Sequence, residues 1–242
     1  MVGALVRGAR RGARLALAAL AVALPGPAAA EQCRIALALG LDVSSSVDGG
    51  EYAFQTEGLA AALMSESVRA AFLSMPGQVV ALNIYEWSGR RQQQTRQDWV
   101  MIRSAADLDA VAGRIATMGR SFEQYPTALG HAILYGAATL ASAPPCAELK
   151  LDISGDGTNN DGVPPPFAAP DAPIVINGLV IGDDGETIGR YYENFVIRGP
   201  GAFVERARDY EDFEAAMKRK LERELRPAAV SLLGTPAPAP RL

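Results

Sequence analysis

An uninterrupted apolar segment near the start of the chain limits the folds available to it. Residues 35–41 are all apolar or glycine, and Asp42 follows them directly. A strand with one face in water alternates apolar and polar residues, whereas a strand buried on both faces is apolar throughout. We therefore expect residues 35–41 to form a central strand of a mostly parallel sheet with helices on both faces. The chain has 242 residues, of which 49% are hydrophobic, and can build one such domain.

Further strands and helices alternate along the chain. Asp48 with Glu51 three positions later is a capping-box pattern and predicts a helix that continues to Val68. Strands are predicted at 78–87, 149–154, 174–181 and 202–205, with a polar edge strand at 95–101. Helices are predicted from Ser104, from Pro126–Thr127, at 188–195 and at 209–225. This order predicts an α/β, doubly wound, mostly parallel sheet of about six strands with one antiparallel edge strand. Ligands bind outside the carboxyl ends of such strands.

The two ends of the chain differ in composition from the rest. The first thirty residues carry four arginines, then an apolar run at 15–24, then Pro25 and small residues up to Ala30. This pattern predicts a signal peptide over residues 1–30, because the apolar run is too short to span a membrane. Arg10–Arg11 leaves twin-arginine export open, although ordinary secretion fits better. We expect a domain over 31–226, a flexible tail over 227–242 and a periplasmic or extracellular location.

The composition excludes several classes of function. With one histidine, His131, and two cysteines, the chain cannot form a zinc finger or an iron–sulfur cluster from its own ligands. No G-x-S-x-G motif is present, so a serine hydrolase is not expected. Cleavage after Ala30 removes four of 23 basic residues and none of 27 acidic ones, which leaves a net charge of −8. That charge argues against nucleic acids and anionic membranes as partners.

Small side chains with oxygen atoms follow the predicted strands. Asp42, Ser44 and Ser46 form a D-x-S-x-S pattern directly after the first strand. Thr127 lies at the start of a predicted helix, and Asp156 follows the strand at 149–154. Oxygen ligands of this kind suit a hard cation, so the five residues predict a Mg²⁺ site, with Mn²⁺ or Ca²⁺ as alternatives. The competing interpretation of the first three is a polar turn that caps the next helix.

In this order, the three motifs resemble the metal-ion-dependent adhesion site of von Willebrand factor type A domains. The resemblance extends over about residues 35–225 and implies that Asp42, Ser44, Ser46, Thr127 and Asp156 hold the metal, partly through water. The segments at 86–89, 154–157 and 199–203 further resemble a subgroup of secreted bacterial members without an assigned role. One difference is that Tyr125–Pro126 stand before the threonine, where that family has small residues.

Several other residues allow two interpretations. Glu86 ends the strand expected beside the first one, and it either faces the metal rim or is an exposed acid at a strand end. Asp152 lies inside a buried strand and needs a partner, so an ion pair or a supporting contact to a metal ligand is expected rather than direct ligation. Trp87 and Tyr125 form either an aromatic rim for a partner or part of the core.

The two cysteines have matching positions relative to the predicted site. Cys33 lies nine residues before Asp42, and Cys146 lies ten residues before Asp156. If both acids lie level at the ends of adjacent parallel strands, both cysteines lie almost level at the opposite end. A disulfide between Cys33 and Cys146 is therefore expected in an oxidising compartment.

The resemblance implies a function as well as a fold. In that family one metal position stays open, and a carboxylate from a partner fills it. We expect a secreted, non-catalytic, Mg²⁺-dependent recognition module whose partner protein presents Asp or Glu, without membrane insertion after signal cleavage. One alternative is a metal-dependent hydrolase that uses Glu86 or Asp152 as its base. The other is a purely structural cation site.

Overall fold

The protein is described by a computed structural model over residues 31–168, 170, 172–182 and 186–226. The expected signal peptide at 1–30 and the expected tail at 227–242 lie outside the described residues. Within the described part, no helix is long and apolar enough to cross a membrane.

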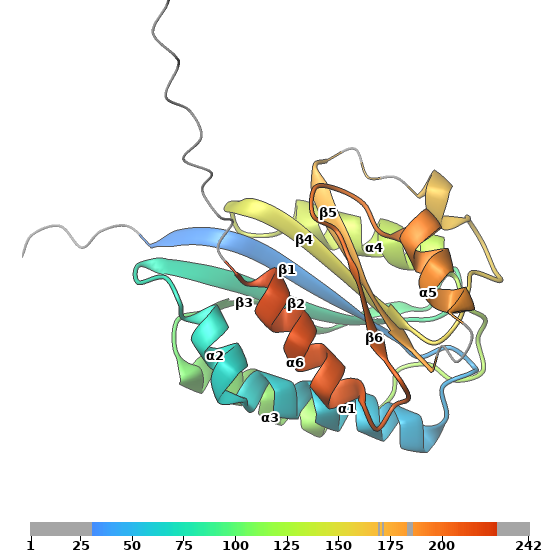
Figure 1. Cartoon of the computed structure of the whole chain (residues 1–242), viewed down its shortest axis with the longest axis horizontal. Helices are drawn as coiled ribbons and strands as arrows, with labels where there is room; N and C mark the ends of the chain where they lie inside the picture. The colour runs from blue at the N-terminus through green and yellow to red at the C-terminus, as the bar shows by residue number, and fades with distance from the viewer. Residues whose placement is uncertain (1–30, 169, 171, 183–185, 227–242) are drawn as a thin grey trace, which may run out of the picture. The chain divides into compact units, whose positions relative to one another are not determined.

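A six-stranded sheet in the order β3-β2-β1-β4-β5-β6 forms the centre of the domain (Figure 1). All neighbouring strands are parallel except the antiparallel pair β2 and β3. The predicted doubly wound sheet with an antiparallel edge strand is confirmed. The strands are β1 (Gln32–Asp42), β2 (Gln78–Trp87), β3 (Gln93–Ile102), β4 (Cys146–Gly155), β5 (Ile174–Ile181) and β6 (Val204–Ala207).

Helices cover both faces of this sheet (Figure 1). One face carries α1 (Gly49–Met64), α2 (Glu66–Phe72), α3 (Ala105–Ala116) and α6 (Phe213–Glu224). The other face carries α4 (Leu129–Ala141), α5 (Thr187–Tyr191) with the π-helical turn Tyr192–Val196, and the 3₁₀ turn Pro165–Phe167. The two-sided cover explains why residues 35–41 of β1 are all apolar or glycine.

The side chains of β1 differ in size between the two faces. Leu37, Leu39 and Leu41 pack against the α1, α3 and α6 layer. Ala36 and Ala38 face the α4 layer, together with Gly40. A Cβ on Gly40 would lie 2.6 Å from the Tyr85 ring, so only glycine leaves room for this tyrosine.

Two helix boundaries differ from the sequence prediction. The helix predicted to run from Asp48 to Val68 is interrupted at Ser65, whose backbone is extended and whose hydroxyl accepts a hydrogen bond from the Val68 amide. Ser65 therefore ends α1 and caps α2. The helix predicted to start at Pro126–Thr127 begins at Leu129, so Thr127 lies in the preceding loop.

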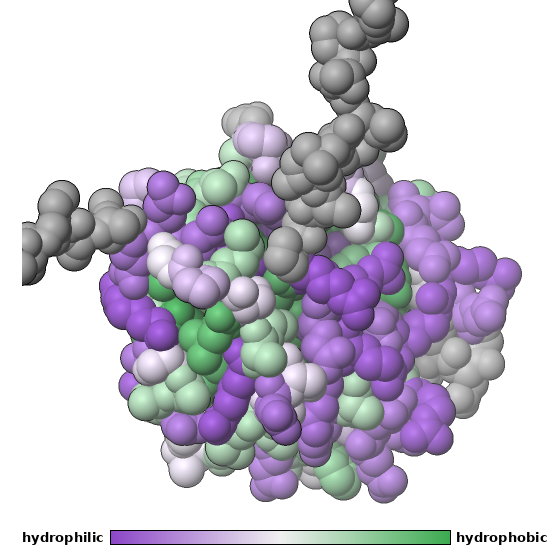
Figure 2. Space-filling model, turned by 60° about the vertical axis from the view of Figure 1, so that its left-hand side comes forward, coloured by the Kyte–Doolittle hydropathy of each residue, from purple (hydrophilic) through white to green (hydrophobic). Residues whose placement is uncertain are grey.

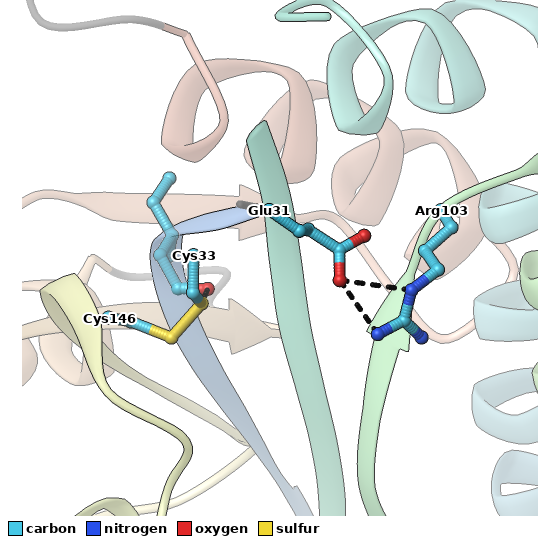
Figure 3. The surroundings of a disulfide bond; sticks show 5 residues. Glu31, Cys33, Arg103 and Cys146 are labelled. Carbon is cyan, nitrogen blue, oxygen red and sulfur yellow. Dashed lines mark hydrogen bonds and ion pairs between the residues drawn. A yellow bond between two sulfur atoms is a disulfide. The ribbon is translucent and has the colours of Figure 1, made fainter. Parts of the chain in front are cut away.

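The disulfide predicted between Cys33 and Cys146 is present (Figure 3). The two cysteines are register partners on β1 and β4, with their Cα atoms 4.5 Å apart. Nearby, Arg103 after β3 forms an ion pair with Glu31 at 2.8 Å. Figure 2 shows one face of the domain, on which hydrophobic residues are interspersed with hydrophilic ones.

Candidate metal centre

The centre of the sheet contains the point at which the strand order changes direction. From β1 the chain proceeds to β2 and β3 on one side, and β4 to β6 extend on the other. Loops that leave such a point diverge and form a crevice at the carboxyl ends of the strands. Asp42 is the last residue of β1, and Asp156 directly follows the last residue of β4. Both carboxylates therefore lie at this edge.

Asp42 is fully buried and only half satisfied. Its Oδ1 accepts a hydrogen bond of 2.7 Å from the amide of Ser44, whereas its Oδ2 is buried without a hydrogen-bond partner among the described residues. Burial, followed by the charge of Asp156, raises the pKa of Asp42 to about 8. An unpaired buried carboxylate is costly unless a cation compensates it. This oxygen fits a metal ligand.

The predicted hydroxyl groups lie beside the two acids. Ser44 Oγ and Ser46 Oγ are 3.1 Å apart, and Ser46 Oγ donates a hydrogen bond of 2.7 Å to Asp156 Oδ1. Thr127 is buried, and its Oγ1 is 4.0 Å from the position that a Cβ on Gly157 would take. The loop after β1, the loop before α4 and the loop after β4 thus bring all five predicted residues together.

Arg120 holds the loop after β1 in place. Its guanidinium donates hydrogen bonds of 2.8 Å to the carbonyls of Val43 and Ser44. On the other side of the loop, the side chain of Gln55 donates to the Asp42 carbonyl at 3.0 Å. Neither residue is predicted from the sequence. No local pattern marks them, because their partners are distant in sequence and are backbone atoms.

Asn160 positions Thr127. The Asn160 side-chain oxygen accepts a 2.8 Å hydrogen bond from the Thr127 amide, and the Asn160 amide donates at 2.9 Å to the Thr127 carbonyl. Asn159 adds a 3.3 Å bond from the Gly130 amide, in the first turn of α4. The sequence feature that could have identified these two residues is the Asn-Asn pair in a loop rich in turn-forming residues. These contacts explain why Thr127 precedes α4 instead of opening it.

Buried hydroxyl groups of two tyrosines lie near the carboxylates. Tyr210 donates a 3.2 Å hydrogen bond to Asp156 Oδ2. A Cβ on Gly155 would lie 2.7 Å from the Tyr192 hydroxyl and 2.9 Å from Asp42 Oδ2, so both atoms border the same small space. Burial, followed by the charge of Asp42, raises the pKa of Tyr192 well above its usual value, so its phenol stays neutral. Among the described residues, this hydroxyl has no hydrogen-bond partner.

Both interpretations of Glu86 were wrong. Glu86 is fully buried, and its carboxylate accepts hydrogen bonds from the Tyr52 hydroxyl at 2.6 Å and the Ser121 amide at 2.9 Å. Arg96 lies 3.7 Å away. Alternation along β2 places Trp87 in the core beside α4 and directs Glu86 to the opposite face, toward α1. Glu86 therefore holds the loop that contains Ser121.

Asp152 forms an ion pair inside the domain. Its Oδ1 lies 2.7 Å from Lys220 Nζ on α6, and the same ammonium lies 2.8 Å from Glu224 Oε1. All three side chains are buried. Asp152 lies four residues before Asp156 on an extended strand that rises roughly 3.3 Å per residue, which places it well away from the candidate centre.

The donor set at the edge of the sheet consists of oxygen atoms only. Among the described residues, no three aspartate, glutamate, histidine or cysteine side chains gather into a metal-binding cluster. The candidate centre therefore depends on the carboxylates of Asp42 and Asp156 and on three hydroxyl groups. Tyr125, next to this centre, is 42% exposed, whereas Trp87 is fully buried. Hard oxygen donors of this kind suit Mg²⁺, Mn²⁺ or Ca²⁺.

Comparison with known proteins supports this fold. The family model described as "Protein of unknown function (DUF1194)" matches residues 32–229. A search of curated protein sequences finds no match. Similar solved structures include a von Willebrand factor type A protein from Catenulispora acidiphila, with 14% identity, a TM-score of 0.50 and coverage of 80% of this chain and 42% of that one.

Two further structures are similar over most of this chain. Proximal thread matrix protein 1 from the mussel byssus, described with a zinc-occupied MIDAS motif, has 13% identity and a TM-score of 0.52, over 79% of this chain and 48% of that one. The pilus adhesin SpaC from Lactobacillus rhamnosus GG, in an open conformation, has 14% identity and a TM-score of 0.55, over 79% and 30%. This chain spans less than half of each of these proteins. At such identities the likeness shows a von Willebrand factor A-like fold alone.

Proposed function

This chain belongs to the DUF1194 family, and we propose that it is a secreted, metal-dependent recognition module that binds a carboxylate of a partner protein. The observation that carries the proposal is Asp42 Oδ2, which is buried without a partner beside a second carboxylate, Asp156. A folded protein does not leave such an oxygen uncompensated without cost. A divalent cation held by Asp42, Ser44, Ser46, Thr127 and Asp156 would supply the missing charge.

Mg²⁺ is the cation that we propose, with Mn²⁺ or Ca²⁺ as alternatives. Zinc favours nitrogen and sulfur ligands, whereas all the donors here are hard oxygens. The zinc-occupied MIDAS motif of the mussel protein supports a divalent cation in this fold without specifying which one. When bound, the cation would attract an oxygen anion, and an Asp or Glu of a partner protein is the anion that we propose.

The surroundings of the centre favour recognition over hydrolysis. The two acids considered as a general base, Glu86 and Asp152, are engaged elsewhere by Tyr52, Ser121 and Lys220. Ser44 stands two residues after Asp42, where phosphotransfer enzymes with this type of sheet need a second acid. The pilus adhesin and the byssal matrix protein support a role in protein contacts.

Secretion is part of the proposal. The Cys33–Cys146 disulfide favours an oxidising compartment, because cytosolic thiols are kept reduced. We propose residues 1–30 as the signal peptide, 31–226 as the domain and 227–242 as the tail. The mature chain then works in the periplasm or outside the cell.

Metal titration of the chain without residues 1–30 tests the centre. Mg²⁺ or Mn²⁺ should raise the melting temperature, since the ion binds only the folded protein; saturation at one hundred times the Kd corresponds to about 2.7 kcal/mol. Asp42→Asn and Thr127→Ala should lose this rise. Glu57→Gln, which changes an exposed acid on α1, is the matched control and should keep it. A wild-type chain that neither binds these ions in calorimetry nor melts higher with them would refute the proposal.

A further inference from the structure

Two hollows flank the candidate metal centre. The first, of about 470 Å³, shares Asp156 with the centre and lies between the start of α1, the end of β5 and the segment before α6. The second, of about 630 Å³, lies between the β2–β3 turn, Tyr125–Pro126 and the first turn of α4. Since β1 and β4 are central in the sheet, the β5 side and the β2–β3 side are opposite sides of the centre.

The first hollow is acidic. Its described lining contains Glu51, Asp156, Asp209 and Glu211, and no lysine or arginine. Backbone amides donate hydrogen bonds to two of these groups, from Asp48 to Glu51 and from Asp212 to Asp209. Such bonds fix the carboxylates in place and leave their negative charge uncompensated by any cation of the lining.

Aromatic rings complete the first hollow. Phe54 is 46% exposed there, and the largely buried Tyr210 lines the same space. A cation gains energy over the face of an aromatic ring as well as from nearby carboxylates. The first hollow therefore suits a lysine or arginine side chain of a ligand.

The second hollow carries the opposite charge. Arg90 and Arg91 are both exposed and line it together with His131. Its one acid among the described residues, Asp161, pairs with Arg90 at 3.0 Å. Arg91 makes no side-chain hydrogen bond or ion pair in the described part of the chain. It is available to an acidic group.

We infer that the partner segment is bipolar: its metal-binding carboxylate is flanked by a basic side chain that enters the first hollow and by an acidic side chain that meets Arg91. This inference rests on the proposed function. Two observations besides the acidic lining support the inference. The first hollow adjoins a centre in which Asp42 Oδ2 is buried without a partner among the described residues, and a basic hollow lies on the other side of that centre.

Charge complementarity explains why a bipolar segment is favoured over a uniform one. The chain from residue 31 has a net charge of −8, so a purely acidic segment is repelled before it reaches the metal. A purely basic segment is attracted but lacks the carboxylate. A segment with both charges gains from each hollow, and the charges fix its direction across the centre.

Synthetic peptides with labelled ends test the inference directly. The probes share a central aspartate; one has two lysines before it and two glutamates after it, one has the reverse order, one has only lysines and one only glutamates. Fluorescence anisotropy with saturating Mg²⁺ should show one of the two bipolar peptides binding at least about tenfold more tightly than both uniform peptides, or about 1.4 kcal/mol. Replacing its central aspartate by asparagine should remove binding.

Charge reversal in the protein identifies the two hollows. Glu211→Lys and Arg91→Glu change exposed side chains that form no side-chain hydrogen bond or ion pair within the described segments, and each should weaken binding of the preferred peptide several-fold. Exchanging the lysines of that peptide for glutamates should remove the effect of Glu211→Lys. Glu57→Lys reverses an exposed charge on α1 outside both linings and should leave the affinity unchanged.

The metal titration separates the two possible failures. All three charge variants should keep the rise in melting temperature with Mg²⁺, because none removes a metal ligand. If the melting temperature of the wild type does not rise with Mg²⁺, the proposed function is refuted. If the rise is intact, equal binding of all four peptides, no binding at millimolar concentration, or affinities insensitive to Glu211→Lys and Arg91→Glu would overturn the bipolar ligand alone.

Discussion

Two pairs of acids, one inside the domain and one at the carboxyl edge of the sheet, differ in how their charge is balanced. In the interior, Asp152 and Glu224 share the ammonium of Lys220, at 2.7 and 2.8 Å. At the carboxyl edge, no lysine or arginine among the described residues forms an ion pair with Asp42 or Asp156. Arg120 lowers the pKa of Asp42 in part, but its guanidinium donates to backbone carbonyls. In the described part of the chain, the protein therefore provides its own cation for the interior acids and no ion-pair partner for the two acids at the edge.

The two ends of the β1–β4 pair also differ in how they are held together. The amino ends are joined covalently by Cys33 and Cys146. The carboxyl ends are held by hydrogen bonds to loops, such as Ser46 to Asp156. The disulfide makes one end of the strand pair rigid, and the acids at the other end form no ion pair within the described residues. This arrangement suits a site that binds a metal ion and then a ligand.

The largest effect is expected at the amino ends. Removing the disulfide with Cys33→Ala and Cys146→Ala should lower the free energy of unfolding by about 5 kcal/mol, since the bond closes a loop with a sequence separation of 113. Urea unfolding measures it. The loss should be equal with and without Mg²⁺, because distant sites add independently. If the loss in free energy of unfolding depends strongly on Mg²⁺, the disulfide and the metal centre are energetically coupled, which would contradict the comparison.

The interior ion pair should have the next largest effect. Lys220→Met leaves Asp152 and Glu224 buried without their cation and should cost about 4 kcal/mol in urea unfolding. Lys218→Met is the matched control on the same helix. Lys218 is partly exposed and pairs with Glu214, so its loss should cost less than about 1 kcal/mol. Equal costs for the two variants would contradict an interior charge balance.

The smallest effect has the opposite sign. Without metal, Asp42→Asn removes a buried acid whose ionisation is penalised by burial and by Asp156, and it should raise the free energy of unfolding by about 1 kcal/mol. With saturating Mg²⁺ the same variant should be less stable than the wild type, because it no longer gains from the ion. Thermal melts in EDTA and in Mg²⁺ provide the comparison. A variant that is destabilised equally in both would show that Asp42 is a purely structural residue.

The sequence alone predicted the features that depend on local pattern. The apolar run before Asp42 identified β1, because burial on two faces leaves no polar positions. Capping residues located the starts of α1 and α3. The nearly equal spacing of Cys33 from Asp42 and of Cys146 from Asp156 predicted the disulfide, because parallel strands rise by the same length per residue.

The five candidate ligands could also be named from sequence, since each follows or precedes a recognisable element. Tertiary structure decided how they are held. Arg120, Asn160 and Tyr210 come from distant segments, and their partners are backbone atoms or single side-chain oxygens that no periodicity marks.

Tertiary structure also decided where the remaining charges point. Glu86 turned toward α1 instead of the metal rim, because alternation along β2 gives Trp87 to the other face. Lys220 reached Asp152 because α6 packs across β4 and β5, an arrangement set by the whole sheet. Local sequence determines which element forms, through periodicity and caps; long-range packing determines which charges meet, and here it left Asp42 Oδ2 without a partner.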